Sequence, residues 1–98
     1  MEIEKFIGIG RENAVKRGEL SALLALDDRI VRREIAKARE RGVNIVNDGS
    51  GVGYWISDDT ADLAEQYRKE HKRALKILYR LKTIRRILKE RGADLSGN

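Results

Sequence analysis

The chain has 98 residues and a mass of 11.2 kDa, the size of one small domain. With no Cys and one His it offers neither a disulfide framework nor a thiolate zinc site, and we expect a cytoplasmic location. No apolar run reaches the roughly 20 residues of a membrane span, whereas 21 Lys and Arg against 16 Asp and Glu permit an anionic partner. No motif indicates a metal, a cofactor or a small-molecule ligand.

Apolar spacing predicts two short helices before residue 27. Between Glu2 and Val15 apolar residues recur three and four positions apart, with glycines between them, so we expect one short helix there. The run from residue 17 to residue 26 is rich in Ala and Leu, which favour helix. A second short helix is therefore expected, with one apolar face formed by Leu20, Leu23 and Leu24.

A third helix is expected over residues 28–41. Asp27 and Asp28 precede it, and a carboxylate at that position accepts hydrogen bonds from the free N–H groups of a new helix and complements its dipole. Its apolar residues Val31, Ile35 and Ala38 stand at i, i+4 and i+7. This spacing leaves the basic residues on the other sides of the helix. Gly42 tolerates left-handed geometry and suits the position just past the end.

Beyond residue 42 the pattern changes to two β-prone runs separated by a glycine-rich turn, which predicts a hairpin in which Tyr54 or Trp55 faces the core. Asp58 and Asp59 then suit the start of a helix that nothing interrupts before Gly92, so it would span residues 59–91. We therefore expect a mainly α fold with a small β-hairpin. Its parts are a first domain over residues 1–57, a long basic amphipathic helix over 58–92 and a disordered tail over 93–98.

Two short helices joined by a tight turn, a basic second helix and a glycine-rich hairpin are the parts of a winged helix-turn-helix. Three segments carry a more specific resemblance: Gly18-Glu-Leu-Ser-Ala-Leu-Leu-Ala-Leu-Asp, Val31 with Ile35, and Glu40-Arg-Gly-Val-Asn-Ile-Val followed by Gly53-Tyr. Over residues 4–57 the chain resembles the DNA-binding domain of the biotin operon repressor family. Over nearly its whole length it resembles small winged-helix proteins of phages of Gram-positive bacteria. The resemblance implies DNA binding without biotin chemistry, because the 98 residues hold no ligase or effector domain.

Several basic residues are candidates for DNA contact. Long donors that read guanine O6 and N7 in the major groove must lie off the core face of a helix, and Arg29, Arg32 and Arg33 meet that condition in the first two turns of 28–41. We predict base contacts for these three. Phosphate contacts, which fix position without reading sequence, are predicted for Lys16, Arg17, Lys37 and Ser50. The alternative is an ordinary solvated face, since acidic residues on the same helix partly neutralise the charge.

The long helix carries apolar residues spaced alternately four and three positions apart, a period of 3.5 that is typical of a coiled coil. With Glu70 as its one polar member, this seam consists of Leu63, Tyr67, Glu70, Ala74, Ile77, Leu81, Ile84 and Leu88. We predict that a second copy covers it, with oligomerisation residues Tyr67, Ala74, Ile77, Leu81, Ile84 and Leu88. The alternative is a bend into two shorter helices that pack on their own domain. Residues 68–91 also hold 11 Lys and Arg and only two acidic residues, which suits phosphate contacts, an acidic protein surface or solubility.

Together these patterns predict a sequence-specific double-stranded DNA-binding protein. The expected role is that of a phage or prophage transcriptional regulator acting as a homodimer or higher homo-oligomer, with no membrane partner. Two other classes stay open: a structural nucleoprotein component in phage DNA replication or packaging, and a protein-interaction adaptor whose basic helix binds an acidic partner. We expect no enzymatic activity, because no set of nucleophile, base and metal can be assembled.

Overall fold

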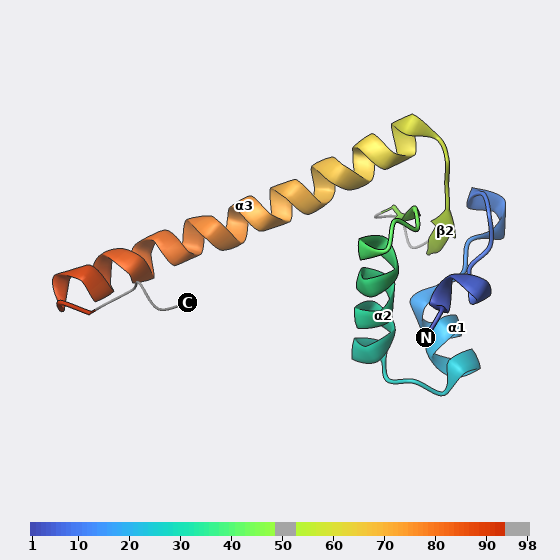
Figure 1. Ribbon diagram of the computed structural model, residues 1–98, viewed down its shortest axis with the longest axis horizontal. Coiled ribbons are helices and arrows are strands. Elements are labelled where there is room, and N and C mark those ends of the chain that lie inside the picture. Colours follow the sequence, from blue (N-terminus) through green and yellow to red (C-terminus); the bar gives the residue numbers. More distant parts are fainter. Residues whose placement is uncertain (49–52, 94–98) are drawn as a thin grey trace. The chain divides into compact units, whose positions relative to one another are not determined.

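Two helices and a hairpin precede one long helix in the computed structural model, which describes residues 1–48 and 53–93 (Figure 1). The fold is mainly α with a small β-hairpin, a winged helix-turn-helix followed by a long C-terminal helix, as predicted. The elements are α1 (Arg17–Leu24), α2 (Asp28–Glu40), β1 (Ile45–Asn47), β2 (Tyr54–Ile56) and α3 (Thr60–Glu90).

The turn between α1 and α2 is tight because Ala25 adopts a left-handed conformation with φ of 51°. The backbone N–H of Leu26 then donates to the carbonyl oxygen of Ser21 at 3.1 Å, and the Ser21 hydroxyl donates to the Leu26 carbonyl oxygen. Of the three leucines expected on one apolar face, Leu20 is fully buried but Leu23 is 66% exposed. The prediction for Leu23 was wrong: Leu24 packs against the core, and at about 100° per residue Leu23 lies about 100° around the helix from it, off the core face.

Helix α2 buries Val31, Ile35 and Ala38, as its periodicity predicted. It ends at Glu40, and Gly42 follows with φ of 94°, the left-handed geometry expected there. The expected carboxylate cap is absent: among the described residues, the Asp27 side chain makes no capping hydrogen bond. The Asp27 carbonyl oxygen instead accepts the backbone N–H groups of residues 30 and 31 at 2.9 and 3.0 Å.

The N-terminal segment differs from the single short helix expected over residues 2–15. It forms two 3-10 turns, Ile3–Phe6 and Arg11–Asn13, and the chain between and after them runs along the outer edge of β2. The N–H of Ile56 donates to the Gly8 carbonyl oxygen at 2.9 Å, and Val15 and Tyr54 exchange a pair of backbone hydrogen bonds at 2.8 and 2.9 Å. Pairing with a strand 39 to 47 residues later in the sequence outweighs the local helical spacing.

The hairpin pairs β1 and β2 antiparallel, with Val46 opposite Trp55. Tyr54 is partly buried and packs against the core cluster, so the expectation that one residue of the pair faces the core is confirmed. Trp55 is buried next to it in the strand. Gly53 enters β2 with φ of 111°, and a Cβ there would lie 2.3 Å from the Val15 carbonyl oxygen. One cluster of buried residues joins the N-terminal segment, both short helices and β1: Ile3, Ile7, Leu20, Val31, Ile35, Ala38 and Ile45.

Helix α3 begins at a polar cap. The Asp59 carboxylate accepts the N–H of Ala61 at 2.8 Å, and the buried Ser57 hydroxyl accepts the N–H of Asp59 and donates to Asp62. The helix runs without a break to Glu90, and Gly92 has φ of 72° just beyond its end. The alternative of two shorter helices is thereby excluded.

The chain divides into two units, Met1–Gln66 and Tyr67–Asn98, so the first turns of α3 belong with the winged unit rather than ending it at residue 57. We call Met1–Gln66 the winged unit and Tyr67–Ala93 the terminal helix segment. Within the described parts of the chain, none of the helices combines the length and apolar character needed to cross a membrane.

Candidate nucleic-acid interface

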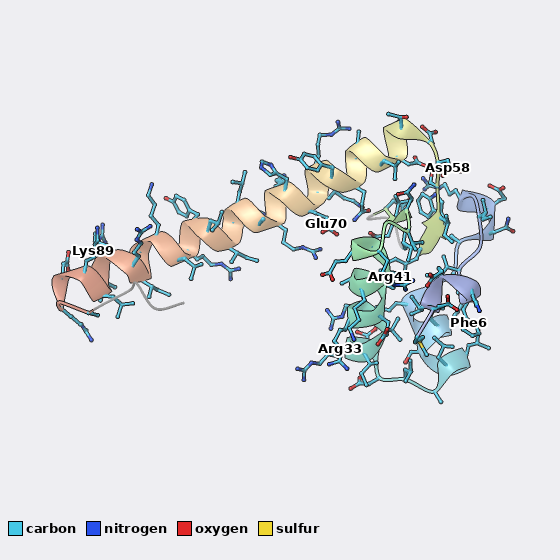
Figure 2. All side chains as sticks on the ribbon, in the orientation of Figure 1. Phe6, Arg33, Arg41, Asp58, Glu70 and Lys89 are labelled. Atoms are coloured by element: carbon cyan, nitrogen blue, oxygen red, sulfur yellow. The ribbon has the colours of Figure 1, made fainter. Side chains whose placement is uncertain are left out.

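Helix α2 presents a broad exposed face opposite its buried one. Residues 31, 35 and 38 point into the core, and at 100° per residue the positions farthest from them are 29, 33, 36 and 40. Arg29 and Arg33 therefore occupy the centre of the exposed face within the first two turns, with the small Ala36 beyond them. In Figure 2, Arg33 projects from α2 on the side away from α1. Both arginines have the exposure that base contact requires.

Arg32 lies on the flank of that face, where Asp28 constrains it. Its Nε atom is 3.4 Å from Asp28 Oδ2, one turn earlier in the helix. The other carboxylate oxygen of Asp28 accepts a hydrogen bond from Arg17 Nε at the start of α1. Asp28 thus binds one arginine from each helix of the helix-turn-helix, whereas the sequence had predicted that it caps α2.

The predicted phosphate-contact residues are distributed over both helices. The interaction of Arg17 with the Tyr54 hydroxyl and its hydrogen bond to Asp28 raise the pKa of its guanidinium above the ordinary value. Lys16 is exposed immediately before α1, and the Glu19 carboxylate accepts its backbone N–H at 3.3 Å, which leaves the lysine side chain outside that capping contact. Lys37 is exposed on α2, 3.7 Å from Glu34. Ser50 lies outside the described residues.

Two further arginines near the end of α2 serve the fold. Arg39 Nε donates to the Ile45 carbonyl oxygen at 2.8 Å, and its guanidinium also reaches the Asn47 side chain, which ties α2 to β1. Arg41 forms a two-pronged hydrogen bond with Glu4 at 2.7 and 3.0 Å, which ties α2 to the N-terminal turn. Neither is directed at an external ligand.

Sequence reasoning missed Arg11, which lies beside the base of the hairpin. Its guanidinium stands 5.4 Å from the centre of the Trp55 ring and pairs with Asp48. Trp55 is buried beneath it, so its ring is not accessible for stacking on a base. No local pattern connects residues 11, 48 and 55, because the contact depends on the strand edge that the N-terminal segment occupies.

The terminal helix segment exposes the seam predicted for oligomerisation. Tyr67 stacks on His71 one turn later, with ring centroids 5.7 Å apart. Ile77, Leu81 and Ile84 are 44%, 51% and 53% exposed, Ala74 is exposed and Leu88 is half-buried. Among the described residues of this segment, the apolar side chains of the seam are therefore mostly exposed.

Comparisons with protein-family models, with curated proteins and with solved structures find no match to this chain.

Proposed function

We propose that this chain is a sequence-specific double-stranded DNA-binding protein, a cytoplasmic transcriptional regulator of a phage or prophage, which acts as a homodimer with α2 in the major groove. The observation that carries the proposal is the pair Arg29 and Arg33. Both lie at the centre of the face of α2 that the winged unit leaves exposed, in the half of the helix that begins at its N-terminus. In helix-turn-helix docking that end of the second helix meets the base edges.

The two arginines have the chemistry that groove recognition needs. An arginine donates two hydrogen bonds to the O6 and N7 atoms of one guanine, and each such pair contributes about 1–3 kcal/mol of discrimination against the wrong base. Arg32 reaches the same groove from the flank of the exposed face of α2, and its ion pair with Asp28 restricts the conformations of its side chain. A side chain ordered before binding loses less entropy when it contacts a base.

Phosphate contacts complete the proposal. Arg17 and Lys16 lie at the start of α1, and Lys37 lies in the third turn of α2, so cations flank the reading face at both ends. These contacts set register and supply affinity, and each phosphate neutralised releases counterions. Binding therefore weakens steeply as salt concentration rises.

Selection from a pool of random duplexes, at about 0.1 M salt where surface charges are already substantially screened, tests the function directly. Enrichment of an inverted repeat is the expected result, because a two-fold dimer presents two copies of α2 to two half-sites. Tight binding without enrichment would instead favour the nucleoprotein component, for which the 11 Lys and Arg of residues 68–91 are the supporting observation. Absence of binding at low salt would reject both.

Two matched variants then separate reading from positioning. Arg33→Ala is expected to cost about 1–3 kcal/mol on the selected site and to relax the preference at one base pair. Lys37→Ala, one residue later on the same helix, is expected to weaken selected and random duplexes alike. Equal losses on both duplexes for Arg33→Ala would remove it from the reading face.

A further inference from the structure

The charge of the side chains differs sharply between the start of α3 and the rest of the helix. From residue 58 to residue 67 there are four acidic residues and no basic ones, whereas residues 68–91 hold 11 basic residues with only Glu70 and Glu90 against them. Each end suits the helix dipole, which favours anions at the N-terminus and cations at the C-terminus. The same asymmetry determines how a second copy of the helix fits against this one.

Glu70 is the informative residue. In a heptad assignment Tyr67, Ala74, Leu81 and Leu88 take the a positions, and Glu70, Ile77 and Ile84 take the d positions. A parallel pair in register places Glu70 directly against Glu70 of the second copy, at the centre of the contact. It also aligns the basic stretch of one helix with the basic stretch of the other. Both arrangements bring like charges together, which disfavours a parallel pair.

An antiparallel pair removes the contact between the two Glu70 residues and reduces the second conflict. Residues 84–91 of the basic stretch then lie opposite residues 60–67 of the second copy, which hold two acidic residues and no basic ones, and residues 68–83 alone stay opposite one another. When each a position faces a d position, Tyr67 faces Ile84, Glu70 faces Leu81 and Ala74 faces Ile77, and two-fold symmetry repeats each layer. Glu70 then lies near the second copy's Arg80, which is adjacent to Leu81 in sequence. The small Ala74 meets the larger Ile77, so side-chain sizes alternate across the centre.

We infer that residues Leu63–Leu88 of α3 bind the same residues of a second copy in antiparallel orientation, with the two-fold axis midway between Leu75 and Lys76. The inference rests on the homodimer of the proposed function and is independent of its DNA site. A second copy is the occupant because an isologous contact needs one self-complementary surface, and this segment supplies the apolar layers and an acid placed opposite basic residues. The two Tyr67 residues are then about 26 Å apart along the axis, at about 1.5 Å per residue.

Distances between spin labels test the orientation in the full chain. The chain has no Cys, so Lys76→Cys, Thr83→Cys and Glu90→Cys each give one labelling site per copy, and all three share the heptad position c. In the antiparallel pair the two labels are offset along the axis by about 2, 22 and 43 Å respectively. In a parallel pair in register the three distances are equal. Distances that rise in this order support the inference, and equal distances overturn it.

A matched pair of charge insertions tests the surface itself. Leu81→Asp places a carboxylate in the seam and is expected to convert the dimer to a monomer by light scattering. Tyr79→Asp introduces the same charge at a residue that is 75% exposed and outside the seam, and is expected to leave the mass unchanged. A wild-type chain that is monomeric at the concentration used for the distances, or a dimer that survives Leu81→Asp, overturns the inference. Both tests measure the dimer and not its DNA binding. A failure to bind DNA in the random-duplex selection would therefore reject the proposed function without overturning this inference.

Discussion

The winged unit and the terminal helix segment are ordered in different ways. Among the residues that the structure describes, the nine buried apolar ones lie between Ile3 and Trp55, in the winged unit. From Tyr67 to Ala93 none of the described residues is buried. The first region owes its structure to tertiary burial, whereas the described part of the second is one helix whose apolar side chains, such as Ile77 and Leu81, are exposed. Helical segments of that kind gain most of their stability from packing against another surface.

The two regions also differ in how their basic residues are balanced by acidic ones. In the winged unit the cations Arg11, Arg17 and Arg41 each contact a carboxylate, so the arginines on the exposed face of α2 stand out against a largely balanced background. In residues 68–91 the basic residues outnumber the acidic ones by nine. An exposed cation is thus informative about DNA mainly in the winged unit, where most of the others have a structural role.

The same substitution made in both regions gives the largest expected difference. Leu20 is fully buried, and Leu20→Ala is expected to lower the free energy of unfolding of the winged unit by about 2–5 kcal/mol, the cost of a cavity in a packed core. Leu75 is 51% exposed on α3 and outside the seam, and Leu75→Ala is expected to change stability by less than about 0.5 kcal/mol. Thermal denaturation followed by the fluorescence of Trp55 measures both. A loss for Leu75→Ala as large as that for Leu20→Ala would show that Leu75 is buried in the folded protein.

Sequence reasoning succeeded where the structure depends on local spacing. The buried face of α2, the hairpin and the uninterrupted α3 all follow from residues within a few positions of one another. It failed where distant segments meet, as in the strand-edge pairing of residues 8–15 with β2 and the contact of Arg11 with Trp55. Among the candidate site residues, periodicity placed Arg29 and Arg33 on the exposed face, but the constraint on Arg32 involves Asp28, whose carboxylate also binds Arg17 on another helix.

A backbone substitution tests whether that strand-edge pairing holds the winged unit together. Gly53→Ala forces a Cβ to within 2.3 Å of the Val15 carbonyl oxygen at a φ of 111°, and is expected to cost on the order of 3 kcal/mol. Gly18→Ala is the matched control, because a Cβ there meets no atom within 4 Å and helix propensity favours Ala by about 0.5–1 kcal/mol. The melting temperature should fall for the first variant and rise slightly for the second. An unchanged melting temperature for Gly53→Ala would mean that the N-terminal segment does not pair with β2 in solution.

The smallest expected effect on stability concerns the ion pair of Glu4 and Arg41, which joins the N-terminal turn to the end of α2. Hydrogen bonds from Arg41, together with a backbone hydrogen bond, lower the pKa of Glu4 from 4.5 to about 2. Because the pKa is lower in the folded state, the contribution to stability is fully present above about pH 4.5 and disappears as the pH falls through 2. The pair is exposed, so solvent screening keeps its effect on stability small.

Arg41→Gln should move the pKa of Glu4 back toward 4.5, measured from the NMR titration of its side-chain carboxyl group. Arg33→Gln on the same helix is the control, and it should leave the Glu4 titration unchanged because Arg33 lies on the exposed face of α2. If Glu4 titrates alike in the wild type and in Arg41→Gln, the N-terminal turn is not held to α2 by this pair. The attachment of residues 1–15 would then depend on the buried Ile3 and Ile7 and on the pairing with β2 alone.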